Sequence, residues 1–392
     1  MNIAKFCNNF KVFLTLNIVL SIPLFCLFVN YNSHDLHLTY SYDDEPSDNN
    51  VLESIDLNVL IELRIKNKYN SYEIPIWIAH LNNGPIYQQS DLINREIPDN
   101  FQRYEYGDNY SNKFDYIEGN LDENQEIVIR YSYKITLRRG NYSGVIQPYN
   151  TSDKIFELFC NKTEVLHDIH DPDLILASNS LVNQSDSPIE KAEKISNFVY
   201  DYLTYSENKV DEGASWAYIY KTGDCDEFSS LLVTLLRIQG IPTRRVGGYC
   251  LYKGPTSIDQ LNPNLEMAFI STKTEDDFQR HAWVEYYVEG IGWIQCDPTW
   301  NSFNHDSLDR ISMTIGTHFT LYGRDNVYTC FSDPIFSITK YTDYVYKVRL
   351  SQSNIDFSEN FEELSVESIY FSIICFSIIF AGICYIVTIK RR

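Results

Sequence analysis

Residues 368–389 form a run of 22 uncharged residues, rich in isoleucine and phenylalanine, that ends at Lys390, Arg391 and Arg392. A helix needs about 20 consecutive apolar residues to cross the hydrocarbon core of a bilayer. Basic residues directly after such a run hold that end of the helix on the cytoplasmic side. Uniform apolarity over this length is not the pattern of an amphipathic core helix. We therefore predict a C-terminal transmembrane helix at residues 368–389.

A second uncharged run lies near the other end of the chain, from 12 to 29, and follows two lysines. This layout fits either a signal peptide or an uncleaved signal anchor. No small-residue cleavage site follows Phe28, and its absence favours the anchor. We predict an N-terminal signal anchor or transmembrane segment within residues 1–32.

The charges of the chain are segregated between its ends and its middle. The chain has 32 basic and 53 acidic side chains, a formal charge of −21. All acidic residues lie between Asp35 and Glu367, and with only 27 of the basic residues in that span its charge is −26. The basic flanks place both termini in the cytoplasm, which predicts a cell-membrane protein whose body, about 33–367, is extracytoplasmic. An acidic body repels phosphate backbones, so nucleic acid is excluded as a partner.

Sequons and cysteines both bear on this compartment. Five Asn-x-Ser/Thr sequons fit an exported glycoprotein, at Asn109, Asn141, Asn150, Asn161 and Asn183.

The body also has an odd number of cysteines, namely Cys160, Cys225, Cys250, Cys296 and Cys330. If one of them is a free nucleophile, the other four either form two disulfides in an undetermined pairing or remain buried thiols.

Residues 51–175 are predicted to be a β-rich extracellular domain. Apolar and polar residues alternate from Leu57 to Ile65 and again from Glu126 to Leu137, as in half-buried strands. Glycine and asparagine clusters separate the apolar runs, which is typical of a sandwich-like fold. No functional site is visible in this region.

Two histidines at the end of the β-rich region raise the question of a metal site. His167 and His170 lie among three aspartates, Asp168, Asp171 and Asp173. Transition metals bind such ligands, but a stretch this acidic is more often a solvated linker. No C-x-x-C pair occurs elsewhere to suggest zinc. We interpret the stretch as a solvated linker and predict no metal.

A helical pattern opens the domain predicted at residues 187–350. Ser187 begins a capping box, with proline at the first helical position. A second helix follows Asp224, which can form a capping pair with Glu227. Its apolar residues recur at spacings of three and four, at Phe228, Leu231, Leu232, Leu235 and Leu236. A glycine and a proline end this helix. Cys225 therefore lies in the first turn of an amphipathic helix.

The position of Cys225 supplies part of what a nucleophile needs. Unpaired amides and the positive end of the helix dipole favour a thiolate there. The carboxylates of Asp224, Asp226 and Glu227 oppose it, because like charges disfavour ionisation. A neighbouring imidazolium is therefore required.

A predicted β-hairpin supplies that histidine. Its first strand begins near His281, and its second strand ends at Asp297. Opposed residues of an antiparallel pair share a face, so a two-residue turn would separate His281 from Asp297. A three-residue loop, 289–291, would place both on one face together with Trp283 and Gln295. Such loops commonly contain glycine, and we predict this register. A thiol, an imidazole and a carboxylate in this arrangement fit thiol acyl chemistry.

Four segments resemble the core motifs of the transglutaminase-like superfamily in its bacterial and archaeal form: Gly-Asp-Cys225-Asp-Glu-Phe-Ser, Leu-Leu-Arg237-x-x-Gly-Ile-Pro-Thr-Arg244, His281-Ala-Trp-Val-Glu and Gly-Trp293-x-x-x-Asp297-Pro-Thr. The resemblance implies a papain-like α+β core. The predicted fold class is therefore α+β: this core is preceded by the sandwich-like domain, between N- and C-terminal transmembrane helices.

The resemblance also implies roles for individual residues. Cys225 would be the nucleophile, His281 the general base and acid, and Asp297 the residue that orients the imidazole. An oxyanion hole would use the Cys225 amide and a second donor, for which Trp216 is the nearest candidate, while Trp283 would wall the site. No cofactor is implied, and no segment matches the calcium sites of animal crosslinking enzymes.

The predicted function is a membrane-anchored extracytoplasmic cysteine acyl-transfer enzyme. It would act on peptide or side-chain amides of a peptide or protein substrate at the cell surface, as a peptidase or amidase, because an open external site is exposed to water. Two alternatives remain open. One is a protein-crosslinking transglutaminase, and the other is a non-catalytic surface binding module that retains the fold.

Overall fold

The computed structural model describes residues 51–84, 87–140, 142–207, 210–251, 267–270, 278–305, 308–321, 324–328, 333–336 and 342–352. The membrane segments predicted at 1–32 and 368–389 lie outside these ranges, as does Cys330. Within the described part of the chain, no helix is both long enough and apolar enough to span a bilayer. The described fold is mixed, with a strand-rich region followed by a region of helices and strands.

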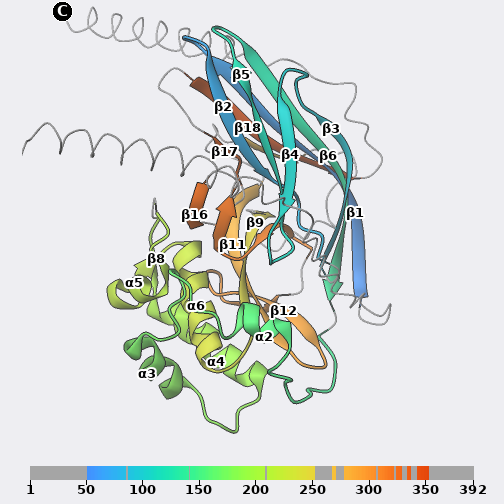
Figure 1. The fold of residues 1–392 in the computed structure, drawn as a ribbon. Helices are drawn as coiled ribbons and strands as arrows, with labels where there is room; N and C mark the ends of the chain where they lie inside the picture. The colour runs from blue at the N-terminus through green and yellow to red at the C-terminus, as the bar shows by residue number, and fades with distance from the viewer. Residues whose placement is uncertain are drawn as a thin grey trace, which may run out of the picture. The chain divides into compact units, whose positions relative to one another are not determined.

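The strand-rich region contains two antiparallel sheets (Figure 1). The five-stranded sheet has the order β10-β18-β1-β6-β3, with β1 Val51–Asn67, β3 Gln88–Glu96, β6 Glu126–Gly140, β10 Met267–Ile270 and β18 Thr342–Gln352. The four-stranded sheet has the order β17-β2-β5-β4, with β2 Tyr72–Ala79, β4 Gln102–Gly107, β5 Lys113–Leu121 and β17 Ile335–Phe336.

Alternation along the strands builds one core between these two sheets. In β1 every second residue from Leu57 to Ile65 is buried, and β6 shows the same period from Ile127 to Leu137. These residues pack in one cluster with Ile74 and Ile76 of β2 and Phe114 and Ile117 of β5. Burial of one face per sheet is the arrangement expected for a β-sandwich.

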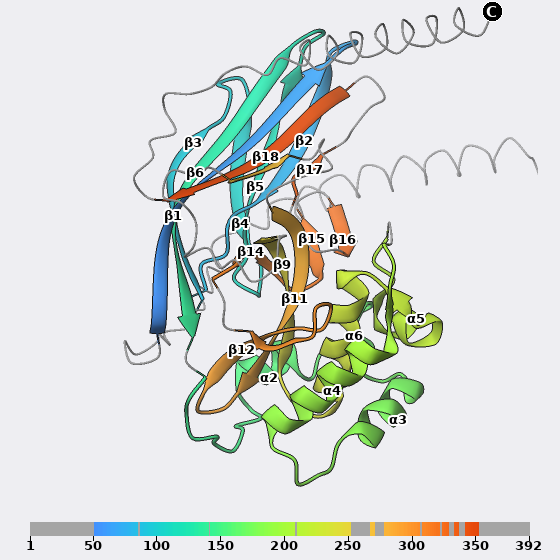
Figure 2. The ribbon, with the colours of Figure 1, turned by 180° about the vertical axis from the view of Figure 1, so that it is seen from behind.

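The five-stranded sheet includes a strand from the far end of the described chain. β18 falls largely within the range 187–350 predicted for the second domain, and it pairs with β1 from Leu57 opposite Gln352 to Asn67 opposite Thr342. In Figure 2 the red β18 lies alongside the blue β1, although the two strands come from opposite ends of the described chain. An alternating pattern identifies a strand but not the sheet that it joins, because strand pairing is a long-range contact.

The second region combines five helices with a separate antiparallel sheet. The helices are α2 Lys154–Phe159, α3 Pro172–Leu181, α4 Pro188–Tyr202, α5 Gly213–Tyr220 and α6 Cys225–Ile238. The sheet has the order β13-β12-β11-β9-β14, with β9 Thr243–Leu251, β11 Phe278–Val288, β12 Gly292–Asp297, β13 Ser302–His305 and β14 Arg310–Ile315. Two short pairs complete it, β7 Thr204–Tyr205 with β8 Thr222–Gly223 and β15 His318–Leu321 with β16 Arg324–Tyr328.

Helix α6 is the central helix of this region. It lies among α3, α4 and α5 in both views (Figures 1 and 2), and its apolar residues pack with Val284, Tyr286 and Val288 of β11. Both predicted capping boxes are confirmed, at Ser187 for α4 and at Asp224 for α6. The helix that begins at Cys225 is thus fixed against the strand that carries the predicted histidine.

Candidate active site

Cys225 is the first residue of α6 and is half-buried. The Asp224 carboxylate caps the helix by accepting a hydrogen bond from the Asp226 amide at 3.0 Å. One turn later, the Ser229 hydroxyl donates to the Ala282 carbonyl at 3.3 Å. Because Ala282 adjoins His281, this contact fixes the first turns of α6 beside the start of the histidine strand.

The buried carboxylate of Glu227 ties together the starts of α5 and α6. Its two oxygens accept the Glu212 and Asp224 amides, each at 2.9 Å. Burial raises the pKa of Glu227 to about 7, against the effect of these hydrogen bonds, and the charges of Asp224 and Asp211 add to the rise. A Cβ at Gly223 would lie 2.3 Å from the Glu227 Cβ, so glycine is required there. The loop in front of Cys225 is therefore tightly packed.

The hairpin has the predicted register. Val284 lies opposite Cys296, and Val288 lies opposite Gly292 across the three-residue loop 289–291. His281 and Asp297 consequently share a face, and His281 Nε2 lies 2.6 Å from Asp297 Oδ2. Both side chains are buried. The other ring nitrogen, Nδ1, is then the one that can exchange a proton with a thiol.

Arg310 is a partner of Asp297 that the sequence analysis missed. Its Nη2 donates to Asp297 Oδ2 at 2.6 Å, while Asp297 Oδ1 accepts the Thr299 amide at 3.0 Å. Burial acts to raise the pKa of Asp297, but His281 and Arg310 outweigh it and hold this pKa well below its usual range. Asp297 is therefore an anion fixed by three donors.

Two tryptophans flank the imidazole of His281. The Trp300 ring stacks on it, with centroids 4.2 Å apart and an interplanar angle of 7°. Trp283 is buried on the same sheet face, 6.4 Å from the imidazole at 22°. The Arg310 guanidinium lies 5.7 Å from the Trp283 ring and 5.8 Å from that of Trp300. Trp300 was also missed, although its position directly after Asp297-Pro-Thr was a usable signal.

Close packing beside His281 requires a glycine on the neighbouring strand. Gly248 of β9 lies opposite His281. A Cβ at Gly248 would lie 2.0 Å from the Ile311 carbonyl oxygen and 3.1 Å from Cη2 of Trp283. The glycine therefore allows β14, which carries Arg310, to approach β9 next to the imidazole.

Trp216 is half-buried on α5. Its ring packs against Tyr220 of the same helix, with centroids 4.9 Å apart. Among the described residues it makes no hydrogen bond or ring contact with His281 or Asp297. Its predicted part in an oxyanion hole stays a prediction.

Cys225 differs from the other described cysteines in its exposure. Cys160, Cys250 and Cys296 are buried thiols, and these four cysteines form no disulfide with one another. Burial raises the pKa of Cys160 to about 11 and that of Cys296 to about 12, and it also raises that of Cys250. Thiols of this kind are unreactive near neutral pH. Cys225 is therefore the described thiol best suited to nucleophilic attack.

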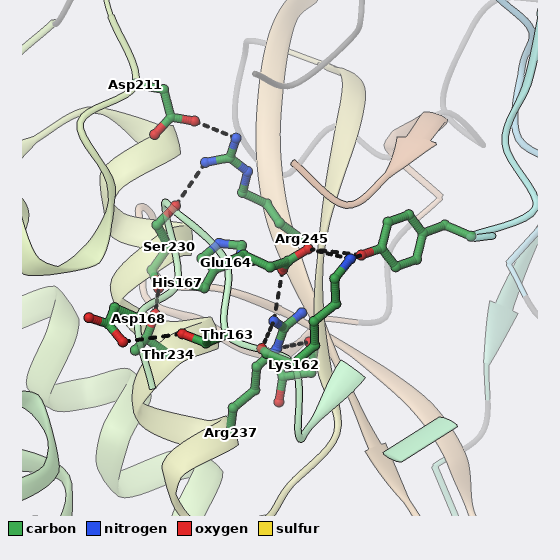
Figure 3. A network of polar contacts seen from close by, with 12 residues as sticks. Lys162, Thr163, Glu164, His167, Asp168, Asp211, Ser230, Thr234, Arg237 and Arg245 are labelled. Carbon is green, nitrogen blue, oxygen red and sulfur yellow. Dashed lines mark hydrogen bonds and ion pairs between the residues drawn. The ribbon is translucent and has the colours of Figure 1, made fainter. Parts of the chain in front are cut away.

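The interpretation of the His167 segment as a solvated linker is wrong at His167, whereas Asp168, His170 and Asp173 are exposed as expected. His167 and Glu164 are buried in a polar cluster that reaches the last turn of α6 (Figure 3). Glu164 Oε2 accepts from Arg237 Nη1 at 2.8 Å and lies 3.1 Å from His167 Nδ1, and Oε1 accepts the Tyr110 hydroxyl at 2.8 Å. The sequence pattern missed this because burial depends on partners distant in the chain. Within the described residues, no group of His, Cys, Asp and Glu could hold a metal.

His167→Asn is expected to reduce the acid sensitivity of folding. Burial lowers the pKa of His167 to about 4 from 6.5, with Glu164 opposing and Arg237 contributing. Between these values the unfolded chain binds the proton and the folded chain does not, so folding stability falls as pH decreases. The loss amounts to about 3 kcal/mol.

Urea denaturation of wild type and His167→Asn at pH 4.5, 5.5 and 7 measures this effect. Glu227 changes stability in the opposite direction, because a carboxyl with a raised pKa favours folding at low pH. The test is therefore the difference between the two proteins, which cancels Glu227. A stability difference that is the same at all three pH values contradicts the prediction.

Comparisons with known proteins match part of this chain to one superfamily. Residues 177–298 match the family model of the transglutaminase-like superfamily. The chain is 35% identical over 104 residues to the Uncharacterized protein YebA of Bacillus subtilis, covering 26% of this chain and 13% of that protein. It is 34% identical over 80 residues to a Protein-glutamine gamma-glutamyltransferase of Pseudomonas aeruginosa, covering 20% of this chain and 10% of that protein. The matches thus span a small part of these curated relatives.

A solved structure extends the likeness beyond the matched segment. A protein of Cytophaga hutchinsonii, provisionally named a cysteine protease, superposes with a TM-score of 0.50 at 14% identity. The superposition covers 79% of this chain and 95% of that one. At this identity the likeness concerns the fold alone, and it includes the strand-rich region.

Proposed function

We propose that this protein, in which residues 177–298 form a transglutaminase-like domain, is a cysteine acyl-transfer enzyme. The observation that carries the proposal is the buried contact of His281 with Asp297 beside the helix that begins at Cys225. A histidine held by a carboxylate can take and return a proton, and a thiol at a helix start can attack a carbonyl. Trp283 forms a wall of the site.

The proposed reaction needs only side chains of this protein, the substrate and water. His281 takes the thiol proton, and the sulfur of Cys225 bonds to an amide carbonyl carbon. The C–N bond then breaks, and the leaving amine takes its proton from His281. Water then attacks the thioester carbonyl carbon as His281 accepts one of its protons. The C–S bond breaks, the acid is released, and His281 returns the proton to the sulfur of Cys225. Asp297, fixed by Arg310, holds the imidazole in orientation throughout.

Hydrolysis of peptide or side-chain amides is the outcome that we propose. The Trp300 side chain at the imidazole is 41% exposed, and water reaches an open site at far higher concentration than any amine. Transfer to an amine is the second candidate, because one relative is named a Protein-glutamine gamma-glutamyltransferase. Incubation with a glutamine-containing protein and a labelled primary amine separates them. Incorporation of label that Cys225→Ala abolishes would contradict a purely hydrolytic enzyme.

His281→Ala is expected to slow alkylation of Cys225 by iodoacetamide about tenfold or more at pH 6.5. An isolated thiol with a pKa near 8.5 is only about 1% ionised there, whereas a paired imidazolium keeps the thiolate populated. Rates measured from pH 5 to 9 by mass spectrometry test this. The matched control is His170→Ala, which replaces an exposed histidine. Cys225 reacting like a free thiol in wild type, with no effect of His281→Ala, would favour the non-catalytic binding module.

The proposed compartment is the cell surface, with membrane anchors at both ends and substrates that are peptides or proteins. In support, the four described sequon asparagines are exposed: Asn109, Asn150, Asn161 and Asn183. External protease treatment of intact cells tests the topology. Digestion of the body with retention of the basic C-terminal tail is expected, and full protection of the body contradicts it.

A further inference from the structure

Tyr205 lies beside the nucleophile through a short parallel strand pair. Its partner in β8 is Gly223, two residues before Cys225. The Ser206 amide donates to the Gly223 carbonyl at 2.8 Å, and the Thr204 amide donates to that of Lys221 at 2.9 Å. These bonds hold the backbone of Tyr205 against the loop that leads into α6.

The Tyr205 ring lies near the first turn of α6. Its centroid lies 6.4 Å from that of Phe228, which is three residues after Cys225. Tyr205 is 55% exposed. Within the described part of the chain its hydroxyl has no hydrogen-bond partner. The phenol is therefore an available hydrogen-bond donor near the N-terminal end of α6.

The charges around Tyr205 agree with this position. Burial raises its pKa to about 12, and among the charged groups Cys225 has the largest effect, followed by Asp224, Glu207 and Asp226. The hydroxyl consequently keeps its proton near neutral pH.

A neutral donor suits this site. Attack on a carbonyl places negative charge on its oxygen, and hydrogen-bond donors aimed at that oxygen stabilise the transition state. The Cys225 amide at the helix start can supply one donor. Asp224 and Asp226 add negative charge nearby, so a second donor must be polar and protonated.

We propose that Tyr205 is that second donor: its O–H hydrogen-bonds to the oxygen of the tetrahedral intermediate formed when Cys225 attacks a carbonyl. This inference rests on the proposed acyl-transfer function and deepens it. The C–S bond forms as the carbonyl π pair moves to oxygen, and the pair returns when the leaving group departs. Tyr205 keeps its proton throughout. Trp216, the candidate from the sequence for this role, packs its ring on Tyr220 and is tested beside Tyr205.

Two reactions of the full-length protein separate this role from a structural one. Acylation by p-nitrophenyl acetate passes through an oxyanion, whereas alkylation by iodoacetamide does not. In Tyr205→Phe the rate of p-nitrophenolate release is expected to fall about 10²-fold with KM little changed. The alkylation rate should stay within about twofold, because the thiolate does not depend on this donor. Trp216→Phe should slow acylation less than tenfold. The matched control is Tyr220→Phe, which removes a neighbouring exposed hydroxyl.

The outcomes are distinguishable. Acylation of Tyr205→Phe at the wild-type rate overturns the proposal. An equal fall in acylation and alkylation also overturns it, because Tyr205 then positions Cys225 rather than binding the oxyanion. A wild-type protein that neither acylates nor alkylates faster than a free thiol contradicts the acyl-transfer function itself, and with it this role. Selective loss of acylation supports Tyr205 as a catalytic residue.

Discussion

Cys225→Ala is expected to lower the turnover of p-nitrophenyl acetate by at least about 10⁴-fold. In the proposed reaction the sulfur of Cys225 forms the acyl-enzyme bond, and among the described thiols only that of Cys225 is more than slightly exposed. Because the side chain is half-buried at a helix start, its truncation should leave the fold intact. Steady-state turnover measured beside circular dichroism of the same samples tests both statements.

Cys160→Ala is the matched control for this prediction. The Cys160 thiol is buried with a pKa of about 11, so its loss should leave turnover within about twofold of wild type. Turnover retained by Cys225→Ala but lost in Cys160→Ala would identify Cys160, and not Cys225, as the nucleophile. Turnover retained by both variants would mean that the ester is cleaved without a thiol from either position.

Arg310→Met should destabilise the folded protein by about 3–5 kcal/mol. Asp297 is fully buried, and Arg310 supplies one of its three donors and a permanent positive charge. Without that charge the anion is left underpaired in the interior, and desolvation is no longer compensated. Urea denaturation at pH 7 measures the change, which should appear as a lower midpoint with an unchanged slope.

Two further variants make this prediction specific. Arg280→Met removes an ion pair with Asp333 from an arginine whose side chain is 52% exposed, and it should cost no more than about 1 kcal/mol. The double variant Asp297→Asn with Arg310→Met removes both buried charges, so it should be more stable than Arg310→Met alone. A double variant that is less stable than Arg310→Met would show that lost packing, rather than unpaired charge, causes the effect.

Local patterns accounted for much of the site. The helix that presents Cys225 followed from apolar spacing and from a capping box within 15 residues of sequence. The shared face of His281 and Asp297 followed from the length of one hairpin loop, whose register the structure confirms. Both features depend on contacts between residues close in the chain, and such contacts leave a periodic trace in the sequence.

Arg310 and Tyr205, which lie next to the candidate site residues, could not be found from such periodic patterns. Arg310 reaches Asp297 because β14 pairs with β9, and that pairing carries no sequence signal at Arg310 itself. Tyr205 lies beside the loop that precedes Cys225 because β7 and β8, two-residue strands on either side of α5 in the sequence, pair with each other. The sequence around a single arginine or tyrosine does not show whether its side chain is exposed to solvent or buried against a partner.

Sequence was therefore sufficient for the helix that begins at Cys225, for the hairpin register that places His281 and Asp297 on one face, and for the separation of a strand-rich region from a mixed one. Strand order, the return of β18 to β1, the burial of His167 and the anchoring of Asp297 by Arg310 required the folded chain. The physical reason is the distance in sequence between the residues that make each contact. Helix periodicity and hairpin register arise from neighbours a few residues apart, whereas sheet order and buried charge pairs are fixed by contacts between distant segments.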